Sequence, residues 1–397
     1  MAKLSLLATL SVVVMSAPCA ANILNHIKTT SQLDADFRLR FESVEQDNVL
    51  DDAQALTFRS RIGFTASMSE HVYVGVEMED TRIALGISDY SVGPTGFNPG
   101  QYSVIADPEH TELDQGYIGY KTQRANIKLG RQVIALDDHR FVGHVGWRQD
   151  RQTFDALRID LNWSKTLSST YAYISQRNRI FADDADLDSK DHILNISATL
   201  PSAKLTAFAY LLEVDSPIAN GLDTYGVGYQ AKPKVGETVL NVSLMYATQS
   251  TEGAIKYDAN YWHASGSVMV GNVLTGIRYE VLGSDDGQYG FSTPLATLHK
   301  FNGWADQFLS TPNAGLEDVS VFASQKSKWG NWRLAYHQYK TEDNTSIADD
   351  DLGSEWNASY LYRINTQFKM GIKGAFYSGD NSRVDTNKWW VWLEAGL

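Results

Sequence analysis

The feature that most constrains this chain is a strict alternation of apolar and charged residues along short segments. In LDADFRLRFESV, residues 33–44, every odd position from 33 to 41 is apolar and every even position from 34 to 42 is charged. Successive side chains of a β-strand point to opposite faces, so this segment predicts a strand with one apolar and one charged face. The apolar face suits either the core of a soluble β-protein or the acyl chains of a bilayer.

Strand alternation recurs almost to the end of the chain. Most of these segments have about the 9–11 residues that a tilted strand needs to cross a bilayer. We predict eighteen strands, at residues 33–44, 54–66, 71–82, 112–121, 124–134, 151–161, 167–178, 190–200, 203–214, 222–232, 236–248, 255–270, 273–282, 317–326, 330–340, 354–363, 366–377 and 388–397.

The connections alternate between short and long, which favours the bilayer. Turns such as TQ, PS, GN and IN are tight, whereas residues 83–111, 135–150 and 283–316 form long polar links. Short turns on one rim and long loops on the other are typical of bacterial outer-membrane barrels. The predicted fold is therefore all-β: a transmembrane antiparallel β-barrel of about 18 strands, with short periplasmic turns and long extracellular loops. A soluble secreted β-protein is the alternative.

The N-terminus predicts export. Lys3, the apolar run LSLLATLSVVVMSAP and the small residues of CAAN have the order of a signal peptide, residues 1–21, which leaves one barrel domain at 22–397. The destination is the Gram-negative outer membrane, reached through the periplasm. The full chain has a net charge of −13, so nucleic acid is not an expected partner.

The ends of the predicted strands indicate contact with lipid. Aromatic rings near strand ends suit the headgroup region; they are Trp163, Trp329, Trp332, Tyr360, Tyr362, Trp389 and Trp390. The last strand, KWWVWLEAGL, resembles the signal read by the barrel-insertion machinery, although it ends in Leu.

The charged face of each strand is expected to line a water-filled lumen, because eighteen strands enclose more space than side chains fill. On the inward parity we count ten bases and seven acids. The bases are Arg38, Arg40, Arg59, Arg61, Lys128, Arg158, Arg278, Arg333, Lys369 and Lys373, and the acids are Asp34, Asp36, Glu42, Glu77, Glu79, Asp160 and Glu280. This predicts a mildly basic lumen that favours anions. The alternative is that most of these charges pair across strands and only keep the wall wet.

Residues 283–316 contain the one connection with a helical pattern. Apolar residues at 295, 298, 301, 305 and 308 predict a short amphipathic turn. Folded into the barrel mouth, this segment would constrict the pore and present His299, Lys300 and Asp306. A lid that packs on neighbouring loops is the alternative.

No motif for catalysis or for a cofactor is present. The sequence has no G-x-S-x-G, P-loop or H-E-x-x-H pattern. His139 and His144, with Asp137 and Asp138, lack the spacing that fixes a metal site, and the acidic runs DDADLD (183–188) and DDD (349–351) lack a complete calcium-loop signature. We expect these runs to be solvated or bridged to lipopolysaccharide. No enzyme activity, cofactor or metal is predicted; an outer-membrane hydrolase acting at the rim and a surface receptor or adhesin remain as alternatives.

Two segments resemble the alginate-export family of outer-membrane porin-like proteins. They are LGRQVIALDDHRFVGHVGWRQDRQTFDALRID, residues 129–160, and FSTPLATLHKFNGWADQFLSTPNAGLEDVSV, residues 291–321. The resemblance implies a monomeric channel for alginate, another saccharide or a smaller hydrophilic solute. It also points to Arg131, Gln132, Arg148 and the stretch from His299 to Asp306 as residues of the rim or constriction, and to Arg158 as a residue of the pore wall.

Overall fold

The structure, a computed structural model, describes residues 31–93, 97–215, 221–253, 255–343, 350–380 and 383–397. The predicted signal peptide, residues 1–21, lies outside the described residues. So does Asp349 of the DDD run.

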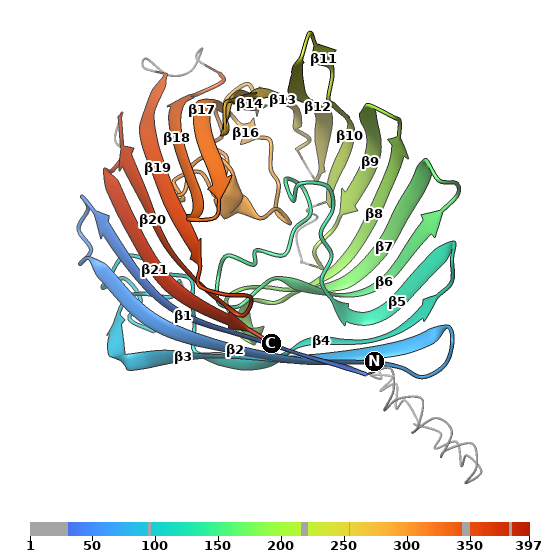
Figure 1. The fold of residues 1–397 in the computed structure, drawn as a ribbon. Coiled ribbons are helices and arrows are strands. Elements are labelled where there is room, and N and C mark those ends of the chain that lie inside the picture. The colour runs from blue at the N-terminus through green and yellow to red at the C-terminus, as the bar shows by residue number, and fades with distance from the viewer. Residues whose placement is uncertain (1–30, 94–96, 216–220, 254, 344–349, 381–382) are drawn as a thin grey trace.

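The described chain forms one closed antiparallel barrel of 18 strands, as predicted (Figure 1). The barrel strands are β1 (Gln32–Gln46), β2 (Ala53–Ser67), β3 (Val72–Asp89), β4 (His110–Lys121), β5 (Ala125–Gln132), β6 (Thr153–Asn162), β7 (Leu167–Asn178), β8 (Leu187–Thr199), β9 (Ala203–Leu212), β10 (Gly221–Ala231), β12 (Thr238–Glu252), β13 (Asp258–Val270), β14 (Val273–Leu282), β17 (Leu316–Ser327), β18 (Gly330–Lys340), β19 (Asp351–Arg363), β20 (Phe368–Ser378) and β21 (Thr386–Gly396). The remaining elements are small: β11 (Lys234–Val235), β15 (Ser284–Asp285), β16 (Tyr289–Gly290) and the 3-10 turns η1 (Asp183–Ala185) and η2 (Leu298–Lys300).

The ring closes where the first and last barrel strands pair. β1 and β21 are antiparallel from Asp36↔Gly396 to Gln46↔Thr386. Leu397 N donates to Ala35 O at 2.9 Å, so the start of β1 and the C-terminus lie side by side at the short-turn rim (Figure 1). Closure leaves no open sheet edge. A sheet that spans a bilayer requires this, because unpaired backbone N–H and C=O groups are costly in the hydrocarbon core.

The alternation predicted from sequence sorts the side chains between the two faces of the wall. Ile62, Phe64 and Ile277 stand on the outer face with 50%, 41% and 54% of their surfaces exposed. Arg40 and Arg59 point inward and are fully buried. The apolar side chains thus face outward. Charged side chains such as these arginines point into the barrel and are buried there, instead of being exposed to water in the lumen.

The strand boundaries differ from prediction mainly in β3, which runs seven residues further, to Asp89. Its extension contains an irregularity, since Thr57 pairs with Ile83 but Ala55 pairs with Ser88. Leu85 and Gly86 in this bulge have φ of 52° and 71°. A bulge breaks the period of two, so the alternation ends before the strand does.

The predicted headgroup position of Trp390 is wrong. Trp163 and Trp329 are exposed near turns, but Trp390 is fully buried inside the barrel, where it meets Trp147. Trp389 and Trp390 are adjacent in one strand, so only one of them can face lipid. In the described part of the chain, no helix has the length and apolar character to cross a membrane.

Candidate functional site

Two long loops enter the barrel and meet inside it (Figure 1). We call residues 133–152 the first inserted loop and residues 291–315 the second inserted loop. They pair through a parallel bridge between Val142 and Leu295, and Gly143 N donates to Leu295 O at 2.8 Å. The amphipathic turn predicted in the second loop is η2. The first loop was predicted as a long link, with Arg148 as a residue of the rim or constriction.

Apolar side chains anchor the first inserted loop to one arc of the wall. The ring of Phe141 lies 4.8 Å from that of Phe208 on β9 and 5.3 Å from that of Tyr261 on β13. Phe291 of the second inserted loop closes the cluster at 5.5 Å from Tyr261. The inward-facing residues of β9 are polar near the short turn, but Phe208, Tyr210 and Leu212 are apolar and buried. Apolar side chains at inward positions were the available sign of a partner within the lumen.

Charged side chains anchor both loops to the opposite arc. Arg148 of the first inserted loop lies 3.0 Å from Glu42 on β1 and 3.2 Å from Asp306 of the second. Lys388 on β21 lies 2.9 Å from the same Asp306 carboxylate. We call these four residues, together with His299 and Lys373, the charge-paired anchor.

Trp147 lies at the centre of the charge-paired anchor. Its ring stacks on His299 with a centroid distance of 5.2 Å and an interplanar angle of 4°. His299 Nδ1 lies 2.6 Å from Asp306 Oδ1, and Lys373 Nζ lies 2.6 Å from His299 Nε2. This arrangement assigns a neutral imidazole that donates to Asp306 and accepts from Lys373.

Burial sets the protonation states of the loop residues in this anchor. Burial lowers the pKa of His299 to about 3, although Asp306 works in the opposite direction. Burial also acts to raise the pKa of Asp306, but His299, Lys388 and Arg148 outweigh it and hold that pKa well below its ordinary value. The anchor therefore contains an ionised Asp306 beside a neutral His299 near pH 7.

A glycine allows the second inserted loop to touch the wall. Gly303 has a φ of 85°, and a Cβ there would lie 2.2 Å from Glu355 Oε2 and 2.3 Å from the Tyr339 hydroxyl. The amide of Ala305 donates to Glu355 Oε1 at 2.9 Å. Only glycine combines this backbone conformation with so close an approach.

The acidic part of the wall beside β3 and β4 is also paired. Arg61 lies against Glu79 and 3.4 Å from Asp114. Arg151 of the first inserted loop lies 2.5 Å from Asp114 and also contacts Glu77. These contacts fix the end of the first inserted loop to the sheet.

Three cations near η2 have no carboxylate partner among the described residues. Arg278, Arg333 and Lys300 line a hollow of about 330 Å³ with His337 and Trp304. Arg333 lies over the ring of Phe322 at 4.5 Å, and Lys300 donates to the backbone oxygen of Asp138 at 2.5 Å. We call Arg278, Arg333 and Lys300 the basic hollow.

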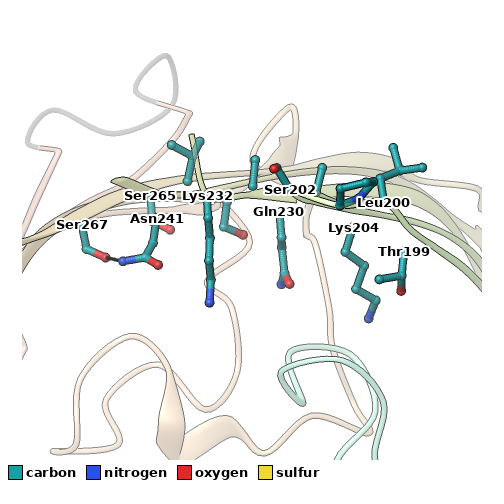
Figure 2. A pocket seen from close by; sticks show the side chains of 14 residues that line it. Thr199, Leu200, Ser202, Lys204, Gln230, Lys232, Asn241, Ser265 and Ser267 are labelled. Carbon is teal, nitrogen blue, oxygen red and sulfur yellow. Dashed lines mark hydrogen bonds between the residues drawn. The ribbon is translucent and has the colours of Figure 1, made fainter. Parts of the chain in front are cut away.

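A second hollow lies at the short-turn end, inside the wall of β8 to β13 (Figure 2). It has a volume of about 570 Å³, and hydroxyl, amide and ammonium groups line it together with apolar side chains. Figure 2 shows Lys232, Gln230 and Lys204 pointing to the same side of the sheet. Lys204 is paired with Asp137 of the first inserted loop at 2.7 Å.

The structure places the predicted site residues in three settings. Buried against partners are Arg40, Arg59, Arg61, Glu79, Glu280, Lys373, Gln132, Arg148, His299 and Asp306. Partly exposed and paired or stacked are Arg38, Glu77, Lys128, Arg131, Arg158, Asp160 and Lys369. Arg278, Arg333 and Lys300 form the basic hollow. His299 and Asp306 are thus packed into the anchor, whereas the sequence predicted that they face the pore.

The predicted surplus of basic charge on the inner face becomes smaller. Further bases that point inward are Arg177, Lys204, Lys232 and Lys388, and six further acids point inward, most of them at bulges or strand ends that interrupt the alternation. These acids are Glu112, Asp114, Asp191, Asp318, Glu355 and Glu394. The interior is therefore not characterised by the net charge of its wall. Its distinctive feature is the group of cations without a carboxylate partner in the basic hollow.

Comparisons with known proteins agree with this architecture. Residues 23–275 match the family model described as alginate export. The fold is similar to Acinetobacter baumannii OccAB4, with a TM-score of 0.74 at 12% identity over 93% of this chain and 98% of that one. It is also similar to Pseudomonas aeruginosa OpdO, with a TM-score of 0.71 at 13% identity over 94% and 99%.

A third similar structure is that of P. aeruginosa OpdK with vanillate, at a TM-score of 0.71 and 14% identity over 92% of this chain and 98% of that one. No curated protein matches the sequence. The chain is located in the bacterial outer membrane. With a closed barrel of eighteen strands and a family match over more than half its length, it belongs to the alginate export family.

Proposed function

We propose that this protein is a passive outer-membrane channel for small hydrophilic solutes and that it prefers anions at the two inserted loops. Selection depends on the width left beside the loops and on the charge at that level. No bond is made or broken, and no cofactor takes part. The channel works as a monomer, with outer-membrane lipid and lipopolysaccharide around it, after assembly by the barrel-insertion machinery.

The basic hollow is the observation that carries this proposal. Arg278 and Arg333 stand on β14 and β18, and Lys300 reaches the same hollow from the second inserted loop. Because these cations have no carboxylate within ion-pair distance among the described residues, their field remains available to a passing anion. Cations elsewhere on the wall are largely neutralised by adjacent acids. A basic constriction lowers the barrier for anions and raises it for cations.

The volume of the hollow favours one acidic unit at a time. About 330 Å³ is enough for a monosaccharide acid or an aromatic carboxylate. The vanillate in the OpdK structure is a carboxylate of this kind. A polymer such as alginate would pass the inserted loops as an extended strand, one sugar residue after another.

Reversal potentials in planar bilayers test the proposal. Under a salt gradient the wild-type channel is expected to show steady conductance and an anion-over-cation permeability ratio above one. The variant Arg278→Gln/Arg333→Gln is expected to lower that ratio several-fold while conductance remains. A protein without conductance would favour the hydrolase or adhesin alternatives, and an unchanged ratio in the variant would remove the basic hollow from the mechanism.

A further inference from the structure

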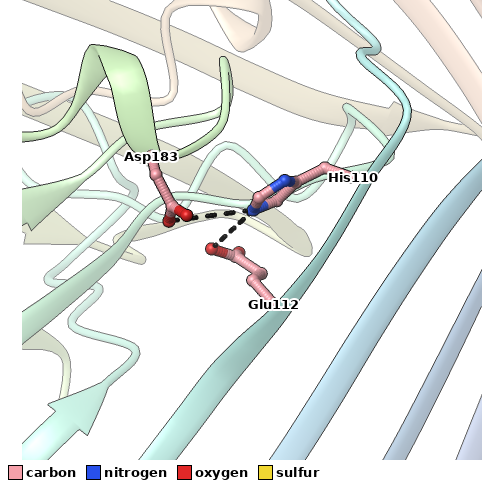
Figure 3. Close-up of side chains that lie close together, drawn as sticks. All are labelled: His110, Glu112 and Asp183. Atoms are coloured by element: carbon pink, nitrogen blue, oxygen red, sulfur yellow. Dashed lines mark ion pairs between the residues drawn. The ribbon is translucent and has the colours of Figure 1, made fainter.

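Three side chains with metal-ligating atoms meet at the long-loop end of the barrel (Figure 3). His110 and Glu112 stand two residues apart on β4, and Asp183 begins η1 in the loop between β7 and β8. Their ligand atoms lie within 4.8 Å of one another. Within the part of the chain that the structure describes, no other three His, Cys, Asp or Glu residues meet in this way.

Glu112 is a buried carboxyl group with little compensating positive charge nearby. Only 8% of its side chain is exposed, and its nearest arginine atom, Arg131 Nη1, is 4.0 Å away. Arg131 already forms an ion pair with Asp155, with 2.8 Å between Nε and Oδ1. In the sheet register Glu112 stands directly opposite Glu79, another acid. Like charges placed opposite each other on neighbouring strands destabilise the pair.

Asp150 of the first inserted loop adds a second uncompensated carboxyl group. It packs against Glu112 and is 2% exposed, and the two carboxyl groups share a hydrogen bond in which one of them holds the proton, while no cation pairs with Asp150 among the described residues. The nearby cations are occupied, since Arg61 pairs with Glu79 and Arg151 with Asp114. Buried carboxyl groups without a counter-charge take up a proton or a cation, so this corner can accept a divalent ion that displaces the shared proton.

The geometry at His110 fits a shared ion better than a hydrogen bond. His110 Nε2 is buried without a hydrogen-bond partner and lies 3.7 Å from Glu112 Oε2 and 3.8 Å from Asp183 Oδ1. Both distances exceed the roughly 3.2 Å limit of an N–H···O hydrogen bond. Ligands of one tetrahedral zinc ion, with bonds of about 2.0–2.1 Å, lie roughly 3.3–3.5 Å apart. The two distances from His110 Nε2 exceed that spacing by a few tenths of an ångström, and the ligand atoms of Glu112 and Asp183 lie within 4.8 Å of each other.

We propose that His110, Glu112 and Asp183 bind a divalent transition-metal cation of the Zn²⁺ class. One imidazole with two carboxylates suits such an ion, whereas Ca²⁺ and Mg²⁺ prefer oxygen ligands alone. Asp150 is a positioning residue, because in its protonated form it donates a hydrogen bond to the Glu112 carboxylate. The ion joins β4 to the β7–β8 loop and, through Asp150, to the first inserted loop. From the sequence, His139 and His144 with two aspartates, and the acidic run that begins at Asp183, were weighed as cation sites, but His110 and Glu112 were not.

Zinc titration of the folded barrel tests this site. Untagged protein in detergent, treated with a chelator and then dialysed, is titrated with Zn²⁺ by isothermal calorimetry. One ion per chain is expected, with affinity at least tenfold lower in both His110→Ala and Glu112→Gln. His71→Ala is the matched control, because His71 is exposed at the short-turn rim and faces Lys121 O. That variant is expected to bind as the wild type does.

Several results would overturn the proposal: no Zn²⁺ binding, equal binding by Glu112→Gln, or binding of Ca²⁺ in preference to Zn²⁺. Heat-modifiable migration on a gel shows whether each variant is folded. A measurement on the wild type alone avoids variants altogether, since the zinc K-edge absorption spectrum is expected to show one imidazole among oxygen ligands. A spectrum with oxygen alone, or with several imidazoles, contradicts the assignment.

Discussion

The charge-paired anchor and the basic hollow line the same lumen, and both are rich in cations. In the anchor, Arg148 and Lys388 each contact a carboxylate within about the distance of a hydrogen bond. In the basic hollow, Arg278, Arg333 and Lys300 contact none among the described residues. The comparison teaches that inward charge has two separate uses in this barrel. Paired charge fixes the loops, and unpaired charge remains for the solute.

The largest effect is expected from breaking the anchor. Arg148→Ala removes the partner shared by Glu42 and Asp306, and loss of one member of a buried ion pair costs about 3–5 kcal/mol. The inserted loops should loosen, so single-channel recordings should show larger and fluctuating currents. Arg333→Ala is the matched control and should leave the currents steady. Steady wild-type currents from Arg148→Ala would contradict a structural role for the anchor.

The apolar arc should respond to a smaller degree. Phe141→Ala removes a buried ring between Phe208 and Tyr261, and such substitutions cost roughly 3 kcal/mol. Protease cleavage within the first inserted loop should become faster while the barrel itself stays resistant. Phe58→Ala, on the lipid-facing side, is the control. Equal cleavage of the wild type and Phe141→Ala would show that the ring does not hold the loop.

Acid should weaken the anchor through His299. Burial lowers the pKa of this imidazole to about 3, compared with an ordinary value near 6.5. The unfolded or released loop therefore binds a proton that the docked loop does not, and docking is weakened as the pH falls from about 6.5 towards 3. Currents should become noisier between pH 6 and pH 4, with Asp306 still ionised. His299→Phe should abolish this dependence, and an equally pH-dependent His299→Phe channel would assign the effect to another group.

The smallest effect on the permeability ratio is expected from removing a paired charge on the wall. Arg158 and Asp160 form an ion pair at 3.0 Å on the wall, so Arg158→Gln/Asp160→Asn removes two charges and no net charge. The permeability ratio should stay within error of the wild-type value. Arg333→Gln, which removes one unpaired charge, should lower the ratio about twofold. A larger change from the paired double variant would mean that paired charge also selects ions.

The barrel could be predicted from the sequence because its pattern is local. Alternation over ten residues and the alternating loop lengths are visible along the chain, and all eighteen strands were found. The interior could not be predicted in the same way. Arg40 could face water or pair with Asp107, and the outcome depends on the path of the loop between β3 and β4. The alternation along a strand contains no information on the path of a distant loop. Bulges such as the one at Asp114 also break the parity on which an inward count depends.

Part of the interior could still be recognised. The helical pattern at 295–308 identified the second inserted loop, and Lys300 was predicted to face the lumen. Trp147 carried no such signal, because a single tryptophan in a polar loop is ambiguous. The inward parity of Phe208 and Tyr210 was a usable sign, since apolar side chains in a water-filled lumen require a cover.

The two inserted loops are attached to nearly opposite arcs of the ring, at β1 and β20–β21 on one side and at β9 and β13 on the other. They act as a brace across the diameter. A ring of thin sheet flattens easily under sideways pressure, and a brace resists that change of shape. The width open to a solute is consequently set within the protein, and stretching or compressing the surrounding bilayer should alter the ionic current very little.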